Sequence, residues 1–211
     1  MNDLLPLITV YLYVALLVLV SERTAIKNEL VSRKFLHIMV GNIAFLLPFF
    51  ESRIVMTFLA AFPFVILTFL MTPYSPVKIM SRTTRSGHAL GLFYYSIAWT
   101  ILAFFLFERC DAISMGIIAM SYGDGFASLI GTRYGKRNYK IFGAVKSFEG
   151  SFAMFTATLI MFLVVSLYYS REITAFLILL AIFATFMEAI TPKGLDNLTV
   201  SIPTAFLYVM I

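Results

Sequence analysis

The chain of 211 residues is 61% hydrophobic, 13% charged and carries a formal net charge of +5. Because a soluble domain has about a quarter charged residues, this composition excludes a soluble fold and indicates a polytopic membrane protein. No long soluble basic segment accompanies the positive charge, so nucleic acid is not expected as a partner.

Apolar stretches follow one another along the chain, most of them near the roughly 20 residues that cross a bilayer. We expect spans at 4–20, 35–50, 54–71, 89–107, 112–130, 152–169, 173–190 and a short one at 198–211, which is marginal for spanning. Pro63 and Pro203 fall inside spans and predict kinks. The fold class is therefore an all-α transmembrane bundle of seven or eight spans, in a single domain over residues 1–211.

Basic residues alternate between the loops. Most of the 16 Lys and Arg follow the first, third, fifth and seventh spans. By the positive-inside rule these loops face the cytoplasm and the N-terminus lies outside. The polar clusters gather on the same side, so we expect an active site at the cytoplasmic face of the plasma membrane.

The first polar cluster, in SRKFLHIMVG, stands at the expected start of the second span. Arg33 and His37 are four residues apart and share a helix face, with Lys34 beside them. The two cations could neutralise phosphate oxygens, and His37 could orient a group or transfer a proton. Basic residues at this depth also snorkel toward anionic lipids, and the cluster alone favours that interpretation.

The richest polar run, residues 121–151, starts inside the fifth span with Asp124. A carboxylate in an apolar helix persists mostly where it pairs, binds an ion or lines a wet cavity, and pairing for packing alone stays open. Beyond it, glycines that let the backbone approach a ligand alternate with lysines and a hydroxyl, as suits a phosphate site. These residues are Gly131, Gly135, Lys136, Lys146, Ser147 and Gly150, with Glu149 among them. Their spacing is not that of a Walker A loop.

The third cluster, EAITPKGLDNLT at 188–199, precedes the last apolar stretch. Asp196 and Asn197 offer the hard oxygen ligands that suit Mg²⁺, which usually takes one or two carboxylates together with phosphate and water. The alternative is that one of them caps the last helix.

Together these segments resemble the CTP-dependent polyprenol kinase family, which includes dolichol kinase and phytol kinase, in its short form. The matching runs are RKFLH at 33–37, GDGFASLIGTRYGK at 123–136, KSFEGS at 146–151 and EAITPKGLDN at 188–197. They occur in family order and cover nearly the whole chain from Arg33 onward. The family usually has Ala where this chain has Gly125.

The resemblance implies transfer of the γ-phosphate of CTP to the terminal hydroxyl of an isoprenoid alcohol held by the apolar spans. The run from Gly131 to Gly150 would correspond to the CTP-binding region, with Arg33 and Lys34 as further nucleotide ligands. Within that frame Asp124 and Asp196, supported by Asn197, are expected to position Mg²⁺. Glu149 or Asp196 would accept the proton of the alcohol, and His37 would assist proton transfer or orientation.

Two other functions stay open. A membrane cytidylyltransferase that makes a CDP-activated lipid also uses CTP and Mg²⁺, but the closing Asp–Arg of those enzymes is absent here. A small ion-coupled transporter or lipid-binding scaffold is disfavoured because the polar groups gather on one side and the halves show no repeat. A homo-oligomer remains compatible with the sequence.

Overall fold

The computed structural model describes residues 3–25, 28–77, 90–141, 144–192 and 194–210. The α-helices of this part are α1 (Leu4–Ala25), α2 (Glu29–Val40), α3 (Phe62–Leu70), α5 (Gly91–Phe105), α6 (Cys110–Ile118), α7 (Asp124–Tyr134), α8 (Phe148–Tyr168), α9 (Phe176–Ile190), α10 (Asp196–Thr199) and α11 (Ser201–Val209). The all-α prediction is confirmed with one addition, a short hairpin of β1 (Asn138–Ile141) and β2 (Ala144–Ser147).

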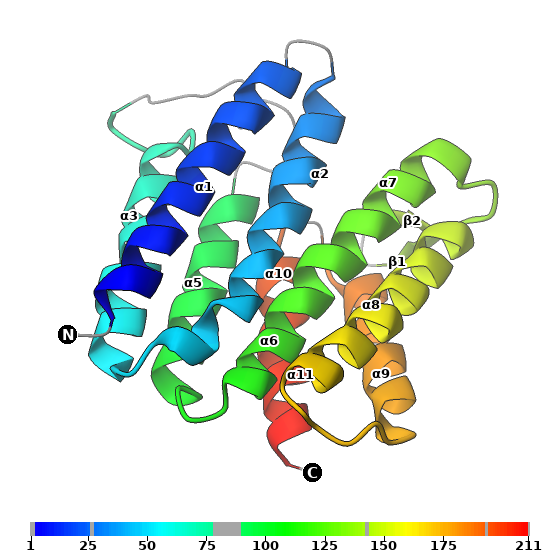
Figure 1. Cartoon of the computed structure of the whole chain (residues 1–211). Coiled ribbons are helices and arrows are strands. Elements are labelled where there is room, and N and C mark those ends of the chain that lie inside the picture. Colours follow the sequence, from blue (N-terminus) through cyan, green and yellow to red (C-terminus); the bar gives the residue numbers. More distant parts are fainter. Residues whose placement is uncertain (1–2, 26–27, 78–89, 142–143, 193, 211) are drawn as a thin grey trace.

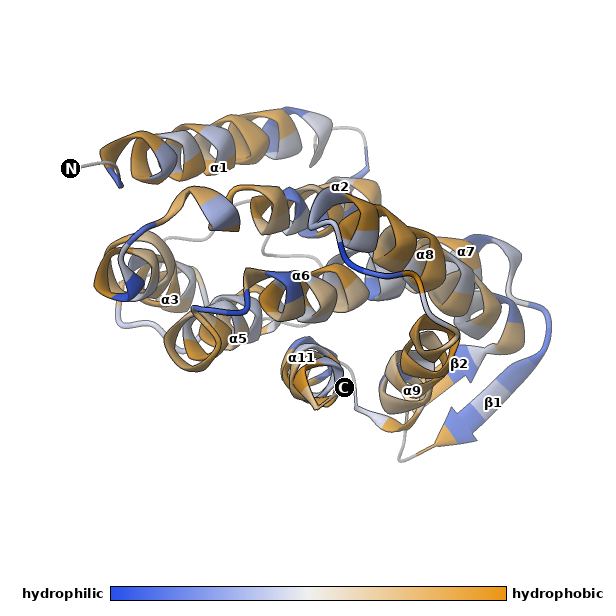
Figure 2. Ribbon diagram, turned by 60° about the horizontal axis from the view of Figure 1, so that its bottom comes forward, coloured by the Kyte–Doolittle hydropathy of each residue, from blue (hydrophilic) through white to orange (hydrophobic). Residues whose placement is uncertain are grey.

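Successive helices run up and down, so that their connections alternate between the two ends of the bundle (Figure 1). The centre is a continuous helical segment, Cys110–Tyr134, in which α6 passes into α7 through a π-helical turn, Ala119–Gly123. Of the 18 most apolar consecutive residues of this segment 67% are buried, compared with 22% of the corresponding residues of α1. Helix α1 accordingly lies as an outer layer beside α2 and α3 (Figure 2).

Apolar helices long enough to cross a membrane are present, as the composition predicts. The described residues hold four such stretches, Leu4–Thr24, Leu30–Phe49, Cys110–Tyr134 and Phe148–Tyr168. The shorter apolar helices are Val55–Leu70, Gly91–Phe105 and Phe176–Ile190. The prediction of a helical membrane protein is therefore confirmed, whereas a count of seven or eight spans stays a prediction.

Both prolines inside predicted spans stand beside helix irregularities. A π-helix, Val55–Ala61, precedes Pro63, and the Phe62 N–H bonds back to the Thr57 carbonyl. Near Pro203 the helix is interrupted at Val200, the residue between α10 and α11. A proline ring cannot donate a hydrogen bond and crowds the preceding turn, so the backbone widens or restarts there.

The second helix begins earlier than the sequence indicated. We expected a span from residue 35, but α2 starts at Glu29, because the Asn28 side chain caps it by accepting a 3.0 Å hydrogen bond from the Val31 N–H. Arg33, Lys34 and His37 therefore lie within the helix and not at its start. Other basic residues behind the predicted orientation, Lys27, Lys78, Arg82, Arg85 and Lys193, lie outside the described residues.

Candidate active site

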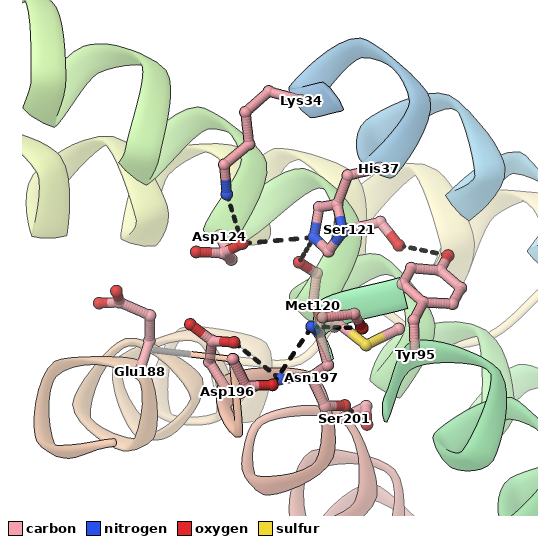
Figure 3. Close-up of polar contacts among 12 residues, drawn as sticks. Lys34, His37, Tyr95, Met120, Ser121, Asp124, Glu188, Asp196, Asn197 and Ser201 are labelled. Atoms are coloured by element: carbon pink, nitrogen blue, oxygen red, sulfur yellow. Dashed lines mark hydrogen bonds and ion pairs between the residues drawn. The ribbon is translucent and has the colours of Figure 1, made fainter. Parts of the chain in front are cut away.

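Helices α2 and α7 bring the first two polar clusters together. The Lys34 Nζ lies 2.8 Å from Asp124 Oδ2, and the His37 Nε2 lies 3.3 Å from the same oxygen (Figure 3). A Cβ atom at Gly125 would stand 2.2 Å from Ile38 Cγ1, so the glycine permits this close approach of the two helices. The Lys34 side chain is only 7% exposed, which contradicts snorkelling toward lipid headgroups.

His37 acts as a hydrogen-bond donor in this arrangement. Its Nε2 faces two acceptors, the Met120 carbonyl at 3.0 Å and Asp124 Oδ2. A nitrogen between two acceptors carries the proton, so this tautomer follows from the surrounding oxygens. The Tyr95 ring meets the imidazole edge-on at 5.4 Å and its hydroxyl bonds to Ser121. His37 therefore orients Asp124, and its Nε2 is not a proton acceptor here.

The hairpin directs Lys146 toward α9. In the antiparallel register Tyr139 pairs with Lys146 and Asn138 with Ser147. The Lys146 ammonium contacts both the carboxylate and the main-chain carbonyl of Glu188. We did not select Glu188 from the sequence as a site residue, although it opens the EAITPKG run. A carboxylate that is buried at a helix end needs a cationic partner. The acidic residue at the end of an apolar run was therefore the sequence signal that could have identified Glu188.

The glycines of the predicted nucleotide region join α7 to α8. Ser147 caps α8 by accepting a 3.1 Å hydrogen bond from the Gly150 N–H. A Cβ at Gly135 would meet the Gly131 carbonyl at 2.3 Å, and one at Gly150 would meet the Ala127 carbonyl at 2.9 Å. Close packing of α7 against α8 therefore explains why glycine occupies these positions. The N-terminus of α8, which is the positive end of its dipole, faces the cavity described below.

Asp196 is the first residue of α10. Its Oδ1 accepts a 3.0 Å hydrogen bond from the Asn197 N–H, and within the described ranges its Oδ2 has no partner. Burial, followed by the Asp124 carboxylate, raises the pKa of Asp196 to about 6. The Asn197 amide donates to Gly91 O at 2.9 Å and to Gly194 O at 3.5 Å. Its Oδ1 is buried without a hydrogen-bond partner.

All these groups line one cavity of about 550 Å³. Of the residues predicted from the sequence, it is lined by Arg33, Lys34, His37, Asp124, Gly131, Lys146, Ser147, Gly150, Asp196 and Asn197. Hydroxyl and amide groups that we did not predict add to it, namely Ser128, Thr132, Asn138 and Ser151, and so does Glu188. Segments far apart in the sequence thus converge on a polar space inside an apolar bundle.

Three predicted residues, Gly135, Lys136 and Glu149, do not line the cavity. Glu149 Oε2 accepts hydrogen bonds from the backbone N–H groups of Lys136 at 3.1 Å and Arg137 at 3.3 Å. The carboxylate therefore fastens the start of the hairpin to α8.

We expect Glu149→Gln to retain activity within about threefold of the parent chain, because the amide oxygen still accepts both hydrogen bonds, whereas loss of a general base lowers the rate by about 10²–10⁴. Turnover at saturating substrate measures this. A loss of more than about 100-fold would instead assign a chemical role to Glu149.

The oxygen donors of the cavity fit a magnesium ion that arrives with a nucleotide. Among the described residues, no group of three or more His, Cys, Asp and Glu side chains forms a metal cage. The unpartnered Asn197 Oδ1 and Asp196 Oδ2, together with the Asp124 carboxylate, are hard ligands. Mg²⁺ usually takes one or two carboxylates and completes its shell with substrate phosphates and water. The donor chemistry of these side chains therefore suits such an ion, and magnesium stays a prediction.

Comparisons with known proteins bear on the four motifs. No family model matches the chain, and no solved structure matches it. The chain is 28% identical over 209 residues to the phytol kinase of Synechocystis sp., which covers 92% of this chain and 86% of the relative. Proteins named probable chloroplastic phytol kinase from Triticum aestivum and Zea mays are also 28% identical, covering 90% of this chain and 69% and 68% of the relatives. The resemblance drawn from the sequence is thereby confirmed.

Proposed function

Because the chain is homologous to proteins named phytol kinase over about 90% of its length, we propose that it is an isoprenoid-alcohol kinase. It transfers the γ-phosphoryl group of CTP to the terminal hydroxyl of the alcohol and releases CDP. The observation that carries this proposal is the convergence of Lys34, Asp124, Lys146 and Asp196 on one cavity within an apolar bundle. The choice of CTP rests on the family resemblance, whereas the residues themselves indicate a nucleoside triphosphate.

The cavity supplies what phosphoryl transfer requires, which is charge neutralisation and positioning. Arg33 and Lys34 approach from α2 and Lys146 from β2, and Gly150 and Ser151 at the N-terminus of α8 line the same cavity. The triphosphate binds among these groups. Lys34 forms an ion pair with the buried Asp124, and Lys146 forms one with the buried Glu188. Both ammonium groups are therefore held in place before the substrate binds.

Asp196 is the carboxylate that accepts the proton of the alcohol. Asp124 is paired with Lys34 and His37, Glu188 is paired with Lys146, and Glu149 lies outside the cavity lining. As the alcohol oxygen bonds to the γ-phosphorus, its proton moves to Asp196 Oδ2 and the bond from the γ-phosphorus to the β-phosphate oxygen breaks. Asp124 and Asn197 would hold Mg²⁺, which would neutralise charge on the phosphate oxygens, so that Asp196 Oδ2 stays available for the proton.

The membrane orientation is part of the proposal. The start of α2 and the α1–α2 connection lie at the upper side of Figure 1, whereas both chain termini lie toward the lower side. We propose an even number of crossings, with the N-terminus outside and the cavity at the cytoplasmic face of the plasma membrane, where nucleotides are available; the basic loops of the sequence support this orientation.

The kcat/KM value should fall about tenfold per pH unit below about pH 6, because proton acceptance requires the Asp196 carboxylate and its pKa is raised to about 6. Asp196 precedes the last helix and lies outside the candidate spans. Because the pKa of Asp196 is raised in the folded state, protonation of this carboxyl does not lower the free energy of unfolding as the pH falls. Loss of activity below about pH 6 is therefore not caused by this group unfolding the protein. A profile that stays flat down to pH 4.5 would exclude Asp196 as the base.

The proposed reaction is tested with purified protein in lipid nanodiscs that contain geranylgeraniol or phytol, supplied with magnesium and CTP. Mass spectrometry should find the alcohol monophosphate and CDP in equal amounts, both dependent on the alcohol. Alcohol-independent hydrolysis, or a lipid that carries CMP, would contradict the kinase. Flux of a solute across vesicles without nucleotide consumption would favour the transporter.

A further inference from the structure

A second cavity, of about 80 Å³, lies between α1, α2, α3 and α5. Its walls include Val18 of α1, Leu67 of α3 and Trp99 of α5, and they are almost wholly apolar. The Phe64 and Trp99 rings, with centroids 6.0 Å apart, also line it. Its chemistry is thus opposite to that of the large cavity.

The two cavities adjoin. His37, Thr68, Met71 and Leu92 line both, so the apolar space adjoins the polar cavity beside His37, whose Nε2 lies 3.3 Å from Asp124 Oδ2. A ligand that spans this boundary must have a polar head and an apolar continuation. Water needs about 10–15 Å³ and polar partners to occupy a cavity, and this one has few such partners.

We propose that the second cavity binds the hydroxyl-proximal isoprene units of the alcohol, an inference that rests on the proposed function. With the hydroxyl at the shared rim, the first units lie between Val18, Leu67 and Trp99. A volume of about 80 Å³ is too small for a long tail, so the remainder leaves beside α1 toward the lipid. The enzyme therefore selects the alcohol by bulk near its hydroxyl and tolerates differences in total length.

Trp99 reports occupancy without catalysis. It is the single tryptophan of the chain, it is 2% exposed, and it lines the apolar cavity. Its indole Nε1 has no hydrogen-bond partner within the described ranges. An isoprenoid chain that binds against the indole ring changes the environment of the ring. The fluorescence emission of Trp99 should therefore change on binding, whether or not a nucleotide is present.

The decisive comparison is Val18→Phe with Leu19→Phe, two neighbouring positions of α1. Val18 lines the cavity, whereas Leu19 is 63% exposed on the outer face. Val18→Phe should raise KM for geranylgeraniol about tenfold or more, since small size changes in an apolar pocket discriminate by about 10–200-fold. It should leave KM for CTP unchanged and abolish the Trp99 response to geranylgeraniol. Leu19→Phe should match the parent chain in every measurement.

The outcomes separate the two proposals. If the parent chain phosphorylates geranylgeraniol and both variants behave alike, the tail site is wrong and the kinase stands. If Trp99 responds in the parent chain and in Leu19→Phe but not in Val18→Phe, and no phosphate is transferred, the site stands and the kinase is wrong. A response that hexadecanol elicits with equal affinity would overturn selection for branched isoprenoids.

Discussion

Asp124→Asn is expected to lower kcat by about 10³-fold or more, which is the scale of losing a preorganised charge at a reacting centre. The substitution keeps the shape of the side chain and removes its charge. Lys34 at 2.8 Å and His37 at 3.3 Å would then face an amide, so neither would be held in place, and a ligand for Mg²⁺ would be weakened. Phosphate transfer at saturating CTP and alcohol measures the effect.

The matched control is Asp111→Asn in the same helical segment, Cys110–Tyr134. Asp111 is 1% exposed and pairs with Arg109 at 3.0 Å and Arg171 at 2.9 Å, at the end of the segment remote from the cavity. Both substitutions remove the charge of a buried, paired carboxylate, so both variants should lose stability. Only Asp124→Asn should lose turnover per folded molecule. Equal specific activities would remove Asp124 from the mechanism.

Lys146→Met is expected to abolish detectable transfer and to weaken CTP binding. The Lys146 ammonium is the cation that β2 brings to the cavity, and a triphosphate placed there would lose that charge-assisted contact. The variant also leaves Glu188 buried without its cation, which destabilises the fold by about 3–5 kcal/mol. Binding of CTP by calorimetry and transfer by product analysis separate the two effects.

Two further variants isolate the role of Lys146. Lys146→Met combined with Glu188→Gln removes both charges, so it should restore thermal stability toward that of the parent chain without restoring transfer. Lys140→Met alters an exposed lysine of the same hairpin that pairs with Val145, and it should keep parental activity. If the double variant were active, Lys146 would have only a structural role.

The sequence predicted the large elements and most of the cavity, because those depend on local pattern. Apolar runs predicted the helices, and a carboxylate inside one of them marked Asp124 as a residue needing a partner. The runs at 33–37, 123–136, 146–151 and 188–197 do meet in space, as a shared site requires. Their occurrence in the order of the family that the sequence resembles had linked them before any geometry was known.

What the sequence did not predict depends on tertiary contacts. The Asn28 cap sets the start of α2, and a single polar residue outside an apolar run is a weak signal. The hairpin of β1 and β2 has four residues a strand and connects α7 to α8, and strands this short give too weak a propensity signal to be predicted. Glu149 was predicted as a site residue and Glu188 was not, yet the fold places Glu149 beside backbone N–H groups and Glu188 in the cavity.

The central claim is that the terminal phosphate of the nucleotide passes to an isoprenoid hydroxyl. It is tested most directly with purified protein, magnesium and geranylgeraniol, supplied in parallel with CTP labelled at the γ-phosphorus or at the α-phosphorus. The γ-label should enter the lipid phase, while all α-label stays in water as CDP. Label from the α-phosphorus in the lipid would show cytidylyl transfer and contradict the account.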